Sequence, residues 1–218
     1  MTDYSDARFN MVEGQVKPNK VTDSALMNAM LNVPRDKFVP KAVRGIAHVD
    51  EDVPIGNGRY LMEPMVFGRL VNDANVRPTD IVLDIGCGYG YSTAILARLC
   101  STVVALESDG TMADKAADIL AELGADNAVV LTGDLTAGWP DQGPYDVIFI
   151  NGAVDHVPQG ILDQLADGGR LATVLASAGG RSAGYLYQKF GETISKIERF
   201  DAYTPYLPGF EPKPVFEF

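Results

Sequence analysis

A glycine-rich turn that directly follows an apolar run constrains the fold of this chain more than any other feature. The run at residues 81–85, Ile-Val-Leu-Asp-Ile, has the continuous apolar character of a buried strand, and Gly86, Gly88 and Gly90 follow it just before a helical stretch. Glycine permits positive φ and lets the backbone approach a ligand closely, while the first turn of the following helix presents unpaired N–H groups. The turn therefore predicts a buried parallel strand with a nucleotide site at its carboxyl end.

From residue 80 onward, short apolar runs alternate with helical periods, which is the pattern of a parallel sheet covered by helices on both faces. The runs predict strands near 80–85, 102–106, 127–131, 146–150 and 170–175. The helical periods predict helices at 91–100, 111–123 and 158–166, and Gly124 is expected to stop the second. Residues 184–190 and 193–200 are expected to form antiparallel strands that close one edge of the sheet. The predicted fold class is α/β, a Rossmann-like, doubly wound, mostly parallel sheet with antiparallel C-terminal strands and an N-terminal helical extension.

The N-terminal extension is expected to contain two clear helices. Thr22-Asp23 has the side chains of a helix cap, and Leu26, Met30 and Val33 recur at helical spacing until Pro34 breaks the run. A second helix is expected to begin at 63–64, with a buried stripe made of Val66, Leu70 and Ala74. We expect residues 1–78 to pack on a core domain of residues 79–218 and to form one globular unit with it.

The charge balance argues against nucleic acid as a partner. Eighteen basic residues against twenty-nine acidic ones give a net charge of −11, which repels phosphate backbones. No stretch has the length and apolarity of a signal peptide or a membrane span, so we expect a cytoplasmic protein without a membrane partner. Cys87 and Cys100 lie outside any CxxC or Cys/His cluster, which predicts reduced thiols and no metal site. His48 and His156 have no motif around them and are expected to be structural.

The spacing of the turn and two acidic residues indicate which nucleotide it suits. Dinucleotide-binding folds space their glycines as G-x-G-x-x-G, whereas this turn reads D-x-G-x-G-x-G, with Asp84 two residues before the first glycine. A carboxylate at that place would face the cationic methionine end of S-adenosylmethionine and would repel a pyrophosphate. Glu107 ends the next strand, where it can accept hydrogen bonds from both ribose hydroxyls. The alternative is that Asp84 caps a turn and that Glu107 is a solvated strand end.

A third strand end adds Asp134 to the predicted site. Gly133 and Asp134 follow the apolar run at 128–131, where the aspartate could hydrogen-bond an adenine amino group or could serve the turn itself. The predicted cofactor is S-adenosyl-L-methionine, with S-adenosyl-L-homocysteine as its product. The residues predicted to bind it are Asp84, Gly86, Cys87, Gly88, Gly90, Tyr91, Glu107, Ser108, Gly133, Asp134 and Leu135.

These features resemble the protein-L-isoaspartate O-methyltransferase family of the S-adenosylmethionine-dependent methyltransferase superfamily. The most distinctive part of the resemblance is the segment at 33–40, Val-Pro-Arg-Asp-Lys-Phe-Val-Pro, with Pro-Ile-Gly after it at 54–56. Further matching segments lie at 11–15, 84–91, 133–134, 138–140, 145–148, 164–165 and 168–171. The resemblance implies transfer of the cofactor's methyl group to the α-carboxylate of isoaspartyl residues, which begins the repair of damaged proteins.

The implied reaction asks little of a general base. A carboxylate is already a nucleophile at neutral pH and the sulfonium is already activated, so catalysis would rest on in-line positioning and partial desolvation of the carboxylate. The implied partner is a protein or peptide that contains isoaspartyl residues, and the sequence leaves the oligomeric state open.

The predicted acceptor segment departs from the family pattern. After Pro-Ile-Gly the family has Gln-Thr-Ile-Ser-Gln-Pro, whose serine lies beside the reacting carboxylate; here Met62 takes the place of that serine and Tyr60 that of the threonine. A thioether donates no hydrogen bond, whereas Arg59 could make a charge-assisted contact to a carboxylate or be a surface cation. Asn151, after the fourth predicted strand, could contact the acceptor or end the strand. The acceptor candidates are thus Arg59, Tyr60, Met62 and Asn151. Two alternative functions stay open: a methyltransferase with a different acceptor, or an inactive relative that only binds the cofactor.

Overall fold

The computed structural model describes residues 4–176 and 180–212, so the ends of the chain beyond them, including Phe216 and Phe218, lie outside the described residues. Its main sheet has seven strands. In spatial order they are β5 (Ala128–Thr132), β4 (Thr102–Glu107), β3 (Ile81–Ile85), β6 (Tyr145–Val154), β7 (Leu165–Ala176), β8 (Ser182–Phe190) and β9 (Thr193–Asp201). The five strands from β5 to β7 run parallel, and β8 and β9 are antiparallel additions. The predicted fold class and the closing of one edge by the C-terminal strands are confirmed.

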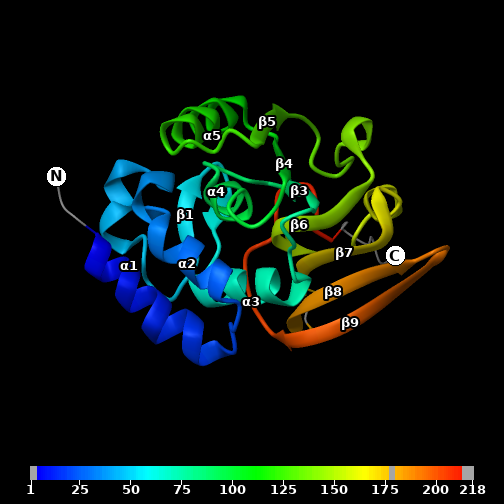
Figure 1. Ribbon diagram of the computed structural model, residues 1–218, viewed down its shortest axis with the longest axis horizontal. Helices are drawn as coiled ribbons and strands as arrows, with labels where there is room; N and C mark the ends of the chain where they lie inside the picture. The colour runs from blue at the N-terminus through cyan, green and yellow to red at the C-terminus, as the bar shows by residue number, and fades with distance from the viewer. Residues whose placement is uncertain (1–3, 177–179, 213–218) are drawn as a thin grey trace, which may run out of the picture.

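The helices lie where the apolar periods predicted them, with two changes in extent. Helix α5 (Gly110–Glu122) packs beside β4 and β5, and Gly124 after it has a φ of +66° (Figure 1). The predicted helix at 91–100 ends earlier, as α4 (Tyr91–Leu96), because the next residues form tighter i→i+3 hydrogen bonds. The predicted helix at 158–166 is wrong in its second half: α6 covers only Gln159–Leu162, and Leu165 already pairs with Tyr145 as the first residue of β7.

Alternating side chains of the strands fill two cores, one on each face of the sheet. Val82 and Val147 belong to a core shared with α2, α3 and α4, whereas Leu83 and Ile148 belong to a second core that α6 and Phe210 of the C-terminal segment cover. Helix α2 is Ser24–Asn32 and α3 is Pro64–Ala74. Burial on both faces explains why the strands are apolar throughout.

The N-terminal helices gather at one end of the sheet, as Figure 1 shows in blue and cyan. Before α2 the chain forms α1 (Ser5–Met11), the π-helical η1 (Val12–Val16) and η2 (Lys17–Asn19); after it come η3 (Arg35–Phe38) and η4 (Lys41–Ile46). Of the predicted cap Thr22-Asp23, it is the Asp23 carboxylate that caps α2, accepting from the N–H groups of Ala25 and Leu26 at 2.8 and 3.2 Å. Across residues 4–176 and 180–212, none of the helices is long and apolar enough to span a membrane.

A short antiparallel hairpin, absent from the predicted elements, leads into α3. It consists of β1 (Val53–Gly56) and β2 (Arg59–Leu61), joined at Asn57 and Gly58, which have φ of +49° and +71°. Asn-Gly with two positive φ angles is the commonest signal of a two-residue hairpin turn, so the sequence did carry it. The strands are only four and three residues long, too short to show an alternating pattern. The hairpin places the predicted acceptor segment against the glycine turn.

Candidate ligand site at the glycine turn

Polar residues from β3, β4 and β6 meet where the strand order of the sheet reverses. β3 lies between β4 and β6, and in open α/β sheets such a reversal is where ligands bind, beyond the carboxyl ends of the strands. Asp84 in β3, Glu107 in β4 and Asn151 in β6 lie toward this edge, and Asn151 Nδ2 donates to Asp84 Oδ1 at 2.6 Å. The structure thus brings together two acids predicted for the cofactor and one residue predicted for the acceptor. Asn151 lies inside β6, which runs on to Val154, and does not follow the strand as predicted.

The glycine turn is closely covered by side chains of the same chain. Its three glycines have φ angles of +75°, +57° and +91°, which residues with a Cβ rarely adopt. A Cβ on Gly86 would lie 2.8 Å from Leu207 Cδ1 and 2.9 Å from Arg59 Nη2, and one on Gly88 would lie 2.7 Å from Ile55 Cδ1. The glycines are therefore needed both for the backbone conformation and for the close approach of these three side chains, which sequence reasoning did not foresee for Ile55 and Leu207.

The carboxylate of Glu107 has its hydrogen-bond partners inside the chain. Oε2 accepts from the N–H of Gly88 at 2.7 Å, and Oε1 accepts from the N–H groups of Ser108 and Asp109 at 2.8 and 3.1 Å. Oε1 also accepts from Nη1 of Arg59 at 2.9 Å. The side chain is 0% exposed, so Glu107 is not a solvated strand end. The acid predicted to hold a ribose is instead paired with a residue predicted for the acceptor.

Arg59 lies between this carboxylate and the glycine turn. Its side chain is 3% exposed, and Nη2 donates to the carbonyl oxygen of Gly86 at 2.5 Å while Nη1 pairs with Glu107. The alternative that Arg59 is a surface cation is therefore wrong. Both charges are buried, and leaving one charge of such a pair without a counter-ion typically costs about 3–5 kcal/mol where no other group compensates it.

Asp84 is a buried acid held by neutral hydrogen-bond donors. Oδ2 accepts from Ser92 Oγ at 2.8 Å and Thr93 Oγ1 at 2.6 Å, and Oδ1 accepts from Asn151. Burial raises the pKa of Asp84 from 3.8 to about 6, although these three hydrogen bonds act in the opposite direction. Keeping a carboxylate ionised there destabilises the fold at neutral pH, and an arrangement of this kind is typical of a functional site.

The raised pKa of Asp84 gives a prediction about stability and pH. The folded chain binds the Asp84 proton more tightly than the unfolded chain does, so the contribution of this group to stability falls as pH rises from about 4 to about 6. Asp84→Asn removes the titration and can keep the hydrogen bonds, because its amide can accept from Asn151 and donate to Ser92 or Thr93. Urea unfolding measures the free energy of unfolding of both proteins. The difference between variant and wild type should shift in favour of the variant by about 1–2 kcal/mol from pH 5 to pH 7. Parallel stability curves for the two proteins would contradict the assignment.

The hairpin separates the three acceptor candidates of its segment. Successive side chains of a strand point to opposite sides, so Arg59 points inward while Tyr60 is 39% exposed on the other side of β2. Tyr60 there lines a hollow of about 410 Å³ together with Glu63 and Tyr203. Met62 is only 4% exposed and belongs to the apolar core shared with α3. Of the three, the structure places only Arg59 at the glycine turn.

Arg35 fixes the end of this segment, a role that sequence reasoning missed. Its side chain is 0% exposed, and it donates from Nε to the carbonyl oxygen of Ala47 and from Nη2 to that of Met62, both at 2.6 Å. The guanidinium also lies over the ring of Tyr91, 4.8 Å from its centroid. Arg35 belongs to the distinctive segment at 33–40, and its contacts give that segment a physical function: they tie η3 to the residue that follows the hairpin.

The other predicted cofactor residues lie around the turn in different settings. The ring of Tyr91 packs 5.6 Å from those of Phe38 and Phe67, so this side chain points into the core and not toward a ligand at the turn. Cys87 is buried, and burial raises the pKa of its thiol well above the usual value. Of the other predicted residues, Gly90 is the third glycine of the turn and Ser108 donates its N–H to Glu107. Gly133, Asp134 and Leu135 follow β5.

The third strand end contributes a turn of its own. Asp134 is exposed, and its Oδ1 accepts from the N–H and the hydroxyl of Thr136 at 2.8 and 2.7 Å. These hydrogen bonds lower the pKa of Asp134. Leu135 is 2% exposed in the second core, and Gly133 donates to the carbonyl oxygen of Glu107 at 3.0 Å. The segment is therefore anchored to the end of β4, with the aspartate at the surface beside it.

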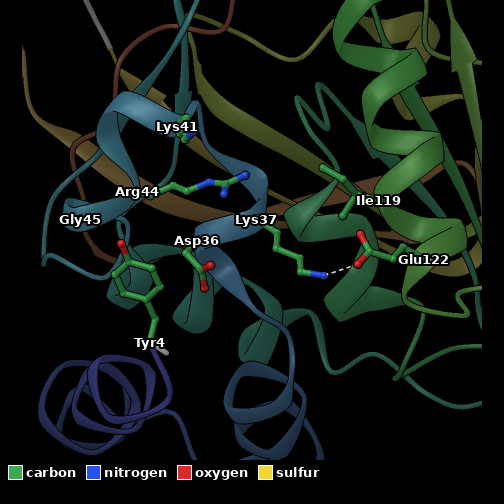
Figure 2. A pocket seen from close by; sticks show the side chains of 8 residues that line it. All are labelled: Tyr4, Asp36, Lys37, Lys41, Arg44, Gly45, Ile119 and Glu122. Atoms are coloured by element: carbon green, nitrogen blue, oxygen red, sulfur yellow. Dashed lines mark hydrogen bonds and ion pairs between the residues drawn. The ribbon is translucent and has the colours of Figure 1, made fainter. Parts of the chain in front are cut away.

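A hollow of about 650 Å³ lies between η4 and α5, and neither Asp84 nor Glu107 lines it (Figure 2). Lys37 crosses toward Glu122 there and pairs with it at 2.5 Å. An adjoining hollow of about 440 Å³ shares Lys37 and extends to Tyr89 of the glycine turn. The residues that line the first hollow are Tyr4, Asp36, Lys37, Lys41, Arg44, Gly45, Ile119 and Glu122, of both charge signs. None of them is a predicted site residue, and no cluster that could hold a metal ion occurs among the described residues.

Comparison with known proteins adds a family to this geometry. The model of the family described as protein-L-isoaspartate(D-aspartate) O-methyltransferase (PCMT) matches residues 8–205. Protein-L-isoaspartate O-methyltransferase 1 of Rhodopseudomonas palustris (strain HaA2) is 38% identical over 170 residues, which are 78% of this chain and 69% of that protein. The corresponding protein of Roseiflexus castenholzii (strain DSM 13941 / HLO8) is 35% identical over 210 residues, 95% of this chain and 94% of its own.

Solved structures show the same fold. A protein-L-isoaspartate O-methyltransferase superposes with a TM-score of 0.81 at 24% identity, covering 93% of this chain and 66% of that one. A beta-aspartate methyltransferase (PCMT) from Plasmodium falciparum was solved in complex with S-adenosyl-L-homocysteine. It superposes with a TM-score of 0.74 at 20% identity, covering 95% of this chain and 99% of that one. At these identities the solved structures establish the fold, whereas the family model and the sequence relatives establish the family.

Proposed function

The chain belongs to the protein-L-isoaspartate(D-aspartate) O-methyltransferase family, and on this premise we propose that it transfers the methyl group of S-adenosyl-L-methionine to isoaspartyl carboxylates in proteins or peptides. The observation that carries the proposal is the pair of buried acids, Asp84 and Glu107, on either side of the glycine turn at the strand reversal. A cationic nucleoside without phosphate is the ligand class that this pair suits.

The chemistry of the residues around the turn matches the parts of this cofactor. The glycines allow close backbone approach, the Glu107 carboxylate matches two ribose hydroxyls, and the Asp84 carboxylate supplies negative charge toward a cationic methionine end. Asp134 at the third strand end would serve the adenine. One internal contact has to be exchanged: the guanidinium of Arg59 occupies Oε1 of Glu107, which the ribose would need.

When bound, the cofactor supplies a methyl group that is already activated on a sulfonium. The chain's own residues would then have to orient the acceptor carboxylate and exclude water from it, since no proton has to be removed from a carboxylate at neutral pH. Arg59 and Asn151 are the polar side chains at the strand reversal that could orient a carboxylate, by charge-assisted and amide hydrogen bonds respectively.

Methyl transfer to a defined peptide tests this function. With labelled S-adenosyl-L-methionine, the protein should methylate a peptide that contains one isoaspartyl residue and leave the same peptide with normal aspartate unlabelled. The label should leave as methanol in mild base, as expected of a carboxyl methyl ester. A protein that binds S-adenosyl-L-homocysteine yet labels neither peptide would contradict isoaspartyl activity.

A different acceptor is the second candidate, and the position of the acceptor segment favours it. Met62, in the place of the family's serine, is packed in the core, and Tyr60 faces the hollow of about 410 Å³ that it lines with Glu63. Neither can therefore contribute the hydrogen bonds that the family segment provides. Transfer of label to components of a cell extract, with none to the isoaspartyl peptide, would identify this case.

A further inference from the structure

We propose that Arg59 is a cation shared by two ligands: it neutralises Glu107 before the cofactor binds, and it turns to the acceptor carboxylate once the ribose hydroxyls have taken its place. The inference rests on the proposed cofactor and acceptor, and it adds an order to their binding. The cofactor would bind first and would strengthen the binding of a carboxylate acceptor.

The geometry of the guanidinium supports the first half of this inference. Arg59 reaches Glu107 Oε1 at 2.9 Å with one terminal nitrogen and the Gly86 carbonyl oxygen at 2.5 Å with the other. It thus bridges the two groups that a nucleoside at this turn would approach, the ribose-binding acid and the backbone of the first glycine. A nucleoside can use Glu107 fully only after Arg59 has withdrawn from Oε1.

The two partners do not depend equally on their pairing. Without Arg59, the Glu107 carboxylate would still accept from the backbone N–H groups of Gly88, Ser108 and Asp109. Without Glu107, the guanidinium would keep one described partner, the Gly86 carbonyl oxygen. The carboxylate can therefore exchange Arg59 for hydroxyl groups at little cost, whereas the guanidinium needs a new anion.

The acceptor carboxylate is the anion that the proposed reaction brings to this place. Arg59 lies on the inward side of β2, in the segment that corresponds to the family's acceptor segment, where the family has glutamine. Glutamine carries no charge that would have to be neutralised and cannot pair with Glu107 as an ion. The exchange of glutamine for arginine thus adds a coupling between the two ligands that an uncharged residue cannot provide.

Isothermal titration of wild type and Arg59→Gln tests the inference without a catalytic readout. S-adenosyl-L-homocysteine should bind the variant about tenfold more tightly than the wild type, because no cation competes for Glu107. In the wild type, saturating S-adenosyl-L-homocysteine should strengthen binding of the isoaspartyl peptide about tenfold, in the usual range of coupling between sites. In the variant, this strengthening should be lost.

Two controls separate charge at this position from net charge. Arg181→Gln removes one positive charge from an arginine that is 67% exposed and pairs with Glu198 and Asp201. Arg181 directly precedes β8, which lies three strands from β3 in the sheet, so the change should leave both affinities unchanged. The isoaspartyl peptide with its free α-carboxylate converted to an amide should show no coupling in any variant.

The outcomes distinguish the inference from the function on which it rests. If wild type and Arg59→Gln bind S-adenosyl-L-homocysteine equally, or if the coupling to the peptide survives in Arg59→Gln, the shared-cation inference is wrong while the proposed function stands. If neither protein binds S-adenosyl-L-homocysteine at all, the cofactor proposal itself fails. Weaker binding by the variant than by the wild type would also contradict the inference, because Arg59 would then help to hold the cofactor.

Discussion

Glu107→Gln is expected to lower the free energy of unfolding by about 3–5 kcal/mol and to abolish measurable binding of S-adenosyl-L-homocysteine. The substitution keeps the shape of the side chain and removes its charge, so the guanidinium of Arg59 is left buried without a counter-ion. Glutamine can also accept only through one oxygen, whereas the two oxygens of Glu107 accept from Gly88 on one side and from Ser108 and Asp109 on the other. Urea denaturation and isothermal titration measure the two effects.

A double-substitution cycle separates the ion pair from the ligand site. Arg59→Gln alone should cost only about 1–3 kcal/mol, since the Glu107 carboxylate keeps its backbone donors. Combining Arg59→Gln with Glu107→Gln should restore much of the stability that Glu107→Gln loses, but it should not restore binding. If Glu107→Gln unfolds at the same urea concentration as the wild type, the buried ion pair does not have the role described here.

Arg35→Ala is expected to destabilise the fold by about 2–5 kcal/mol and to loosen the hairpin β1–β2. The substitution leaves the buried carbonyl oxygens of Ala47 and Met62 without their donor, at a cost of about 1–3 kcal/mol each, and empties the space beside Tyr91. Because Met62 directly follows the hairpin, amide hydrogen exchange at residues 53–61 should become faster relative to that of β3.

Arg44→Ala is the matched control for Arg35→Ala. Arg44 lies in η4, in the same region of the chain, but its side chain is exposed at the hollow of Figure 2. Its removal should change stability by about 0.5 kcal/mol at most. Equal effects of the two substitutions on unfolding and on exchange in the hairpin would mean that Arg35 does not anchor the acceptor segment.

Much of the fold could be predicted because the sheet is regular and buried. The strands of the sheet follow one another as apolar runs, and the glycine turn after β3 and the cap Asp23 have unambiguous local chemistry. The helix at 158–166 failed because Ile161, Leu162 and Leu165 are all buried, so an apolar period alone could not show that Leu165 already pairs with Tyr145. The hairpin β1–β2 was signalled only by the Asn-Gly turn at 57–58.

The site could be predicted in its members but not in their pairing. Asp84, Glu107 and Arg59 were each singled out by position, the acids for a cofactor and the arginine for an acceptor. The pairing of Arg59 with Glu107 depends on the hairpin, which brings Arg59 to the end of β4 although the two residues are 48 positions apart in the chain. Likewise, the contact of Leu207 with Gly86 depends on the C-terminal segment, whose Leu207 N–H donates to the Ala153 carbonyl oxygen of β6 at 2.9 Å. Such long-range contacts leave no periodic signal in the sequence.

A crystal structure of the protein with S-adenosyl-L-homocysteine bound tests the central claim most directly. The expected result is a nucleoside at the glycine turn whose two ribose hydroxyls donate to the carboxylate of Glu107, with the guanidinium of Arg59 withdrawn from that carboxylate and turned toward the acceptor side. A nucleoside bound with the Arg59–Glu107 pair intact, or bound away from the glycine turn, would contradict it.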